Sequence, residues 1–227
     1  MRAVLFPGQG SQYVGMGSDF YKKFDLVKKI FKTVDDSLGY PLSKLILNGP
    51  TEVLKLTENT QPAIMTVGVS IYRVLNEEFG FNLNTAKFFA GHSLGEYTAL
   101  VCSNSLTLEN AAYLLQARGK FMQEAVPSSE GGMLAVLGMK LNEVEQEIKM
   151  LSKENICEIA NDNSNSQVVV SGKKKNIINF ANILRTKKKK AIILPVSAPF
   201  HSSLMGSAAK KMKDKINNTD FAIPKPS

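Results

Sequence analysis

The segment that decides the fold is Phe88–Leu100, FFAGHSLGEYTAL, in which Ser93 stands between Gly91 and Gly95. An apolar run precedes the first glycine and a helix-favouring run follows the second, so the segment predicts a strand, a tight turn and a helix. The G-x-S-x-G spacing matches a nucleophile elbow, in which side chains larger than glycine would collide because the backbone folds sharply. In such a turn the serine hydroxyl stands at the carboxyl end of a strand, beside helix N–H groups that favour negative charge.

The same spacing also arises by chance, so two interpretations of Ser93 stay open. It is either a nucleophile or only a small residue in a structural turn. The apolar strand before the turn and the helix after it favour the nucleophile, because the elbow requires that context. We therefore predict an α/β fold with a reactive serine at the end of a strand.

A nucleophilic serine needs a base, and the sequence holds two histidines, His92 and His201. His92 adjoins Ser93, and neighbouring side chains on a tight turn point apart. His201 comes just after the predicted strand 191–197, so it is expected at the carboxyl edge of a sheet, as the serine is. His201 is therefore the candidate general base; the alternative is a helix-capping or surface histidine.

An arginine interrupts the apolar stripe of the helix predicted from Thr107 to Ala125. Arg118 lies on a stripe that repeats at steps of three and four and is otherwise apolar: Ala111, Leu114, Leu115 and Met122. An arginine that faces a core is costly unless an anion meets it. Two partners stay open: an Asp or Glu elsewhere in the fold, or a substrate carboxylate bound by both arms of the guanidinium.

A glycine-rich loop, FPGQGSQ at Phe6–Gln12, follows the first predicted strand. Its glycines permit a tight turn, and Gln9 can offer N–H donors toward the edge of the sheet. The loop lacks the Lys-Ser/Thr ending of a P-loop and the spacing of the dinucleotide fingerprint. It therefore gives little support to phosphate binding.

Composition indicates a soluble globular protein. The chain has 227 residues, of which 44% are hydrophobic and 21% charged, enough to bury one large core or two small ones. No apolar run reaches the ~20 residues of a membrane span, and the start of the chain lacks a signal-peptide core. Cys102 and Cys157 show no metal-ligand spacing and indicate no disulfide framework, so we expect a reducing compartment.

The net charge of +8 favours acidic partners. Nucleic acid, anionic lipid, phosphorylated cofactors and acidic proteins all fit that description. Two lysine runs, Lys173–Lys175 and Lys187–Lys190, contribute to the charge, and we expect both to be solvated ends of secondary-structure elements. No aromatic residue interleaves with either run and no nucleic-acid module appears, so nucleic acid is the weakest of these partners.

Hydrophobic periodicity predicts helices before the elbow. Residues 18–38 carry apolar side chains at alternating steps of four and three, which predicts one amphipathic helix with Ser18 as its N-cap. Residues 60–80 predict a second helix, with Pro62 in its first turn. Together with the elbow, these helices indicate a large α/β domain.

The pattern changes after the helix that carries Arg118. Strands and helices then alternate in the order β-α-β-β-α-β, with a turn at residues 161–166, which is the order of a ferredoxin-like unit. We therefore predict a small ferredoxin-like domain at residues 127–195. It is inserted into a large α/β domain formed by residues 1–126 and 196–227.

Five segments together resemble one known family. They follow the family order along nearly the whole chain: FPGQGSQYVGMG at Phe6–Gly17, QPA at Gln61–Ala63, GHSLGEYTAL at Gly91–Leu100, QARGKFMQEA at Gln116–Ala125 and VSAPFHSSLM at Val196–Met205. The chain resembles the malonyl-CoA:acyl carrier protein transacylases, which are acyltransferases of fatty acid and polyketide synthesis. The resemblance implies a hydrolase-like α/β domain with a central, mostly parallel sheet, and an inserted ferredoxin-like domain.

The resemblance also implies roles for the candidate site residues. Ser93 is the acylated nucleophile, and His201 is its base and later its acid. Gln9 and Leu94 supply backbone N–H groups to the oxyanion hole. Arg118 pairs with the free carboxylate of malonate.

The implied reaction transfers a malonyl group from malonyl-CoA to the phosphopantetheine thiol of acyl carrier protein, through a malonyl-serine ester. Phe200, just before His201, resembles the malonyl-selecting version of its motif. One thioester replaces another at nearly balanced energy, so we expect no metal and no cofactor besides coenzyme A and phosphopantetheine on the two substrates. We expect a cytoplasmic monomer that binds malonyl-CoA and acyl carrier protein, and neither nucleic acid nor a membrane.

Two other functions remain open from the sequence. A serine esterase or thioesterase of hydrolase type would let water resolve the acyl-serine, and an inactive fragment would bind the carrier protein without forming one. Family members continue past the position of Ser227. We therefore expect a C-terminally truncated chain whose histidine lacks the segment that orients it in the family.

Overall fold

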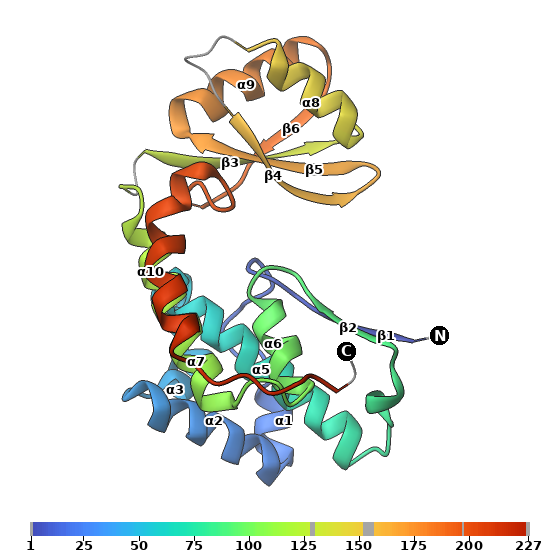
Figure 1. Cartoon of the computed structure of the whole chain (residues 1–227), viewed down its shortest axis with the longest axis vertical. Coiled ribbons are helices and arrows are strands. Elements are labelled where there is room, and N and C mark those ends of the chain that lie inside the picture. The colour runs from blue at the N-terminus through green and yellow to red at the C-terminus, as the bar shows by residue number, and fades with distance from the viewer. Residues whose placement is uncertain (1, 128–129, 152–156, 197, 226–227) are drawn as a thin grey trace. The chain divides into compact units, whose positions relative to one another are not determined.

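The computed structural model of the chain forms two compact units (Figure 1). One unit comprises Met1–Lys120 and Met212–Ser227, and the other comprises Phe121–Lys211. The first holds a parallel sheet and the second an antiparallel sheet, so the fold is mixed α/β. The structure describes these residues: 2–127, 130–151, 157–196 and 198–225.

The sheet of the first unit has two parallel strands, β1 (Ala3–Phe6) and β2 (Phe88–Gly91). Phe6 stands opposite Gly91 in the register, so both strands end at the same edge of the sheet. Figure 1 shows the two strands side by side. The glycine-rich loop that follows β1 and the elbow that follows β2 therefore begin next to each other.

Helices make up most of the first unit. The long helix α5 is buried over most of its surface, with Ala63, Met65 and Val74 fully enclosed. The helices and their bounds are α1 (Ser18–Lys23), α2 (Asp25–Leu38), α3 (Leu42–Asn48), α4 (Thr51–Leu54), α5 (Thr57–Glu77), α6 (Gly95–Cys102) and α7 (Leu108–Glu124), with a short 3-10 helix η1 (Leu83–Thr85).

The single helix predicted over residues 18–38 is two helices, α1 and α2, and that prediction is wrong. The chain is extended at Phe24 (φ −119°, ψ 121°). The centroid of the Phe24 ring lies 6.0 Å from the ring centroids of Phe20 and of Phe79. The predicted N-cap is wrong as well. Gly17 precedes the first helical residue with φ 73°, no side chain caps the helix, and Ser18 is itself helical.

Pro62 lies inside helix α5 and not in its first turn, because the helix begins at Thr57 and not near residue 60. The extra turn is stabilised by its own polar side chains. The Thr60 hydroxyl donates to the Leu54 carbonyl, and the Asn59 amide donates to the Val53 carbonyl at 2.9 Å. Apolar periodicity could not detect this turn, since the residues that form it are polar.

The second unit has a four-stranded antiparallel sheet in the order β4-β5-β3-β6. Helices α8 and α9 pack on one face of the sheet through a buried apolar cluster that includes Leu134, Val170 and Phe180. The elements are β3 (Gly131–Leu137), α8 (Leu141–Lys149), β4 (Cys157–Ser164), β5 (Gln167–Lys173), α9 (Lys174–Thr186) and β6 (Lys190–Ile193), followed by the 3-10 helix η3 (Ser203–Met205) and α10 (Gly206–Asn217).

The turn predicted at residues 161–166 is too long. Strand β4 continues to Ser164, and its polar end pairs with β5, with Asn161 opposite Val169 and Ser164 opposite Gln167. Irregular register along this pairing accommodates the polar residues at an exposed end. Backbone pairing with the apolar strand β5 overrides the turn preference of these side chains.

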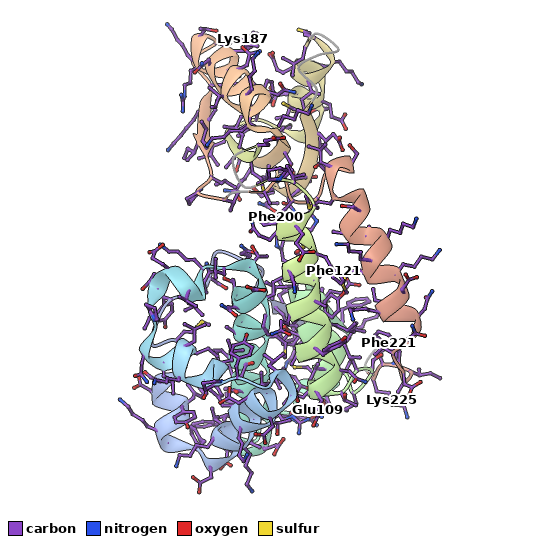
Figure 2. All side chains as sticks on the ribbon, turned by 90° about the vertical axis from the view of Figure 1, so that its left-hand side faces the viewer. Glu109, Phe121, Lys187, Phe200, Phe221 and Lys225 are labelled. Carbon is purple, nitrogen blue, oxygen red and sulfur yellow. The ribbon has the colours of Figure 1, made fainter. Side chains whose placement is uncertain are left out.

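The opposite face of the antiparallel sheet carries a second apolar cluster. Met133 and Val169 contribute from the sheet, and Phe200 and Met205 from the segment after β6. Figure 2 labels Phe200 and Phe121, which packs against the same cluster from α7. This packing fixes the segment that carries His201.

The lysine runs are solvated ends of elements, as predicted. Lys173–Lys175 are exposed at the junction of β5 and α9, and Lys187 and Lys188 are exposed at the end of α9. Among the residues that the structure describes, no helix combines the length and the apolar character that a membrane span requires.

Candidate functional site

The elbow has the backbone that a nucleophile elbow requires. Strand β2 ends at Gly91, helix α6 begins at Gly95, and Ser93 between them has φ 56°. A Cβ atom on Gly91 would lie 1.8 Å from the backbone carbon of Gly95, and one on Gly95 would lie 2.4 Å from the Phe6 carbonyl oxygen. Both glycines are therefore needed for the turn to close against β1.

We expect Gly91→Ala to destabilise the first unit by about 3 kcal/mol or more, because its Cβ meets backbone that cannot move away. Urea unfolding followed by circular dichroism measures the change. Gly80→Ala is the matched control: Gly80 has φ +66° with nothing within 4 Å, so its cost is only the left-handed backbone, about 1–2 kcal/mol. If the two variants lose the same stability, the close packing of the elbow is wrong.

Arg118 contacts the candidate nucleophile directly. Its Nη2 atom donates to Ser93 Oγ at 3.0 Å, and its Nη1 atom donates to Gln61 Oε1 at 2.7 Å. The Tyr97 ring lies 6.0 Å from the guanidinium carbon. Four elements thus meet here: the elbow, α5, α6 and α7.

The guanidinium of Arg118 lies in a poorly hydrated environment, and this burial lowers the pKa of Arg118. The ion pairs formed by the described residues do not include Arg118. The structural ion pair considered above as its alternative partner is therefore absent from this part of the chain. A partly buried cation that donates hydrogen bonds to a neutral amide and a hydroxyl is ready to receive an anion.

The loop that carries Gln9 adjoins the elbow. The His92 amide donates to the Phe6 carbonyl at 3.0 Å, and a Cβ on Gly8 would lie 2.4 Å from the His92 ring. Leu94, the other residue assigned to the oxyanion hole, directly follows Ser93, and its side chain is buried. Ser93, Leu94, Arg118 and the Gln9 loop are therefore brought together in the first unit.

His201 and Phe200 belong to the second unit. His201 is exposed and has φ 57°, a left-handed backbone that is uncommon for histidine. Phe200 is buried in the second apolar cluster. A Cβ on Gly131 would lie 2.2 Å from the Pro199 ring, so the loop before His201 rests tightly on the start of β3.

Glu158, on β4, holds the turn that follows His201. Its carboxylate accepts a hydrogen bond from the Ser203 backbone amide at 2.8 Å and another from the Ser203 hydroxyl. The Ser202 hydroxyl donates to the Pro199 carbonyl at 2.7 Å. The chain on the C-terminal side of His201 is therefore held by the Glu158 carboxylate and by the hydrogen bond from Ser202 to Pro199.

The sequence predicts no role for Gln61, which contacts Arg118, or for Glu158, which contacts the turn after His201. Gln61 belongs to the QPA motif, and a buried glutamine on an apolar helix indicates a polar partner. Glu158 gives no sequence signal, because it meets Ser203 only through the tertiary fold. No group of three or more histidine, cysteine or acidic side chains in the described residues is placed to hold a metal ion.

A strained serine between two close-packed glycines, with a helix N-terminus behind it and a cation beside it, is the arrangement typical of enzymes that transfer or hydrolyse acyl groups. The family profile described as "Acyl transferase domain" matches residues 4–227. The chain therefore belongs to the acyl transferase family, and the resemblance inferred from its motifs is confirmed.

Within this family the chain is similar to proteins named malonyl CoA-acyl carrier protein transacylase. It is 42% identical to that of Bacillus subtilis over 221 residues, which are 96% of this chain and 68% of the relative. It is 38% identical to that of Escherichia coli K12 over 223 residues, 98% of this chain and 71% of the relative.

Solved structures agree with this grouping. An acyl-carrier-protein-S-malonyltransferase from Bartonella henselae is 43% identical and superimposes with a TM-score of 0.93, over 99% of this chain and 72% of that one. A malonyl-transacylase in complex with a type II PKS acyl-carrier protein is 38% identical, with a TM-score of 0.93 over 98% of this chain and 72% of that one.

Proposed function

We propose that this chain transfers a malonyl group from malonyl-CoA to the phosphopantetheine thiol of an acyl carrier protein. The observation that carries the proposal is the contact of Arg118 with Ser93 Oγ at 3.0 Å, without a protein carboxylate paired to the guanidinium in the described residues. An acyl group bound to this serine that ended in a carboxylate would meet this cation. The names of the similar proteins support the same donor and acceptor.

The proposed chemistry is a double displacement through Ser93. His201 accepts the hydroxyl proton as Oγ attacks the thioester carbonyl. When the C–S bond breaks, it gives this proton to the departing thiolate of coenzyme A. The backbone N–H groups of Gln9 and Leu94 stabilise the tetrahedral oxyanion, a term typically worth about 3–4 kcal/mol per donor. The carrier thiol then attacks the malonyl ester, and the same proton relay releases the serine.

Arg118 and Phe200 are proposed to select the acyl group. A guanidinium binds a carboxylate with two parallel hydrogen bonds, which a neutral acetyl group cannot form. The ring of Phe200 packs with Ala198 and Met205 in the apolar cluster. Its proposed effect is on the position of His201, which adjoins it in sequence.

The finer fold assignment belongs to the same proposal. The strand order β4-β5-β3-β6, with two helices on one face, supports a ferredoxin-like small domain at residues 127–195. The parallel strands β1 and β2, the elbow and their helices support a hydrolase-like large domain, which we place at residues 1–126 and 196–227. The two compact units divide at other positions, since residues 121–126 and 196–211 lie in the unit of the antiparallel sheet. We further propose a cytoplasmic monomer, with no cofactor beyond the thioester substrate and the phosphopantetheine of the acceptor.

Transfer to a carrier protein tests the proposal against both alternatives. We expect malonyl-CoA to acylate the chain and added acyl carrier protein, carrying phosphopantetheine, to remove the label as a malonyl-thioester; mass spectrometry detects both species. Release of free malonate at the same rate with and without carrier indicates a thioesterase. Carrier binding in a pull-down, without any acyl-serine, indicates a binding fragment.

The basic surface gives this assay a second measurable outcome. A net charge of +8 attracts an acidic carrier and the phosphates of coenzyme A. The second-order rate constant of transfer should therefore fall as salt screens the attraction. A rate constant that does not depend on ionic strength would show that electrostatic attraction does not contribute to the recognition of the carrier protein.

A further inference from the structure

We propose that Gln61 is a positioning residue that holds the guanidinium of Arg118 and thereby sets the preference of the site for acyl groups with a free carboxylate. The inference rests on the proposed function, because it assigns the anion that Arg118 receives. It begins from a pair of contacts: Arg118 donates from Nη1 to Gln61 Oε1 at 2.7 Å and from Nη2 to Ser93 Oγ at 3.0 Å.

Two acceptors on two arms fix the plane of the guanidinium. The group is flat, so a bond from each Nη atom removes rotation about the last side-chain torsions. Gln61 is 1% exposed, and its rotamers are confined by the packing of α5. The orientation of Arg118 is therefore imposed by a rigid neighbour and is present before any substrate arrives.

A close approach of two helices makes the contact possible. A Cβ atom on Gly119 would lie 2.5 Å from the Glu58 Cα atom and from the Thr57 carbonyl oxygen. Only glycine therefore allows α7 to lie this near the first turn of α5. Gln61 lies three residues after Glu58, about one helical turn further along α5. Arg118 immediately precedes Gly119.

The neutrality of Gln61 is essential to its role. An amide oxygen orients the guanidinium but leaves its full charge for a ligand, whereas a carboxylate at the same position would form an ion pair. The burial that lowers the pKa of Arg118 also strengthens its attraction for a nearby anion. The surroundings add an aromatic ring, Tyr97, and an exposed carboxylate, Glu96, which forms no ion pair with Arg118 among the described residues.

Gln61→Glu is the sharpest test, because it changes one atom and places a carboxylate beside the guanidinium. We expect kcat/KM for malonylation of Ser93 from malonyl-CoA to fall about 10- to 100-fold, mostly through KM. Acylation from acetyl-CoA should fall by much less than malonylation does, since that donor has no carboxylate to bind the cation. The ratio of the two rates is the readout, and a general structural defect would not change it.

Gln61→Met keeps the length of the side chain and removes the acceptor, which guards against a misfolded first variant. It should lower the malonyl rate by less than the glutamate does, again without a matching loss for acetyl. Asn59→Ala is the matched control on the same helix turn. The Asn59 side chain accepts a hydrogen bond from the Tyr40 hydroxyl at 2.8 Å and donates one to the Val53 carbonyl at 2.9 Å. Because these bonds do not involve Arg118, the variant should affect both donors equally.

A binding measurement separates this inference from the proposed function. In a Ser93→Ala background no acyl-enzyme forms, and calorimetry reads the affinities for malonyl-CoA and acetyl-CoA directly. We expect Gln61→Glu to reduce the malonyl-to-acetyl affinity ratio about tenfold or more. An unchanged ratio, or equal losses for both donors in the glutamate and methionine variants, overturns the inference even if the parent chain transfers malonate. Failure of the parent chain to transfer malonate, with the ratio still reduced, would overturn only the proposed function.

Discussion

Ser93→Ala is expected to abolish the malonyl adduct that forms when the chain is incubated with malonyl-CoA. The Ser93 Oγ atom accepts the acyl group. Alanine keeps the Cβ atom and removes only this oxygen, so the backbone of the elbow should stay unchanged. Loss of a covalent nucleophile commonly costs about 10⁴-fold or more in turnover. Intact-protein mass spectrometry measures the adduct, and peptide mapping should place it on Ser93 in the parent chain.

The matched control is Ser37→Ala on helix α2. Ser37 is only a local hydrogen-bond donor, to the Thr33 carbonyl at 2.7 Å, so its loss should leave the adduct intact. Circular dichroism must show that both variants fold, since the elbow is under backbone strain at Ser93. An adduct that persists in Ser93→Ala, on any other side chain, would refute Ser93 as the nucleophile.

The elbow could be predicted from the sequence because its geometry is local. A strand, two glycines and a helix determine the turn within eight residues of chain, Phe88–Gly95, and the structure places Ser93 at φ 56° between close-packed glycines. The order β-α-β-β-α-β of the second unit could be predicted for the same reason, since each element has its own hydrophobic periodicity. The order and type of these elements were predicted correctly, but their ends were not: the N-cap at Ser18 and the start of α5 were both wrong.

Features that depend on two distant elements were not. The Gln61–Arg118 contact joins residues 57 positions apart, and it depends on the approach of α5 to α7 that Gly119 permits. The break at Phe24 follows the same rule, because its ring packs against Phe79, a residue that follows the end of α5. Hydrophobic periodicity places Arg118 on a buried stripe of α7, but it cannot predict which side chain accepts hydrogen bonds from the guanidinium.

Arg118→Ala is expected to remove the preference for malonyl groups. The variant loses the only guanidinium that contacts the nucleophile among the hydrogen bonds of the described residues, and with it the partner proposed for the malonate carboxylate. Truncating one member of a buried charge pair typically costs 2–5 kcal/mol or more, which is about 30-fold or more in malonyl kcat/KM. Acetyl-CoA makes no such pair, so its rate should change by only a few fold. Paired rate measurements with the two donors give the result.

Arg73→Ala controls for the loss of a cation from the same unit. Arg73 lies on α5 and approaches Glu77 on the surface at 3.6 Å, so its removal should leave the ratio of the two rates unchanged. Arg118→Lys adds a graded test: a lysine keeps the charge but cannot hold Gln61 and Ser93 in one rigid plane, so it should recover part of the malonyl rate. Equal loss for malonyl and acetyl donors in Arg118→Ala would mean that the arginine supports the elbow and does not read the acyl group. Selective loss with partial recovery by lysine is explained only by an anion bound at this cation.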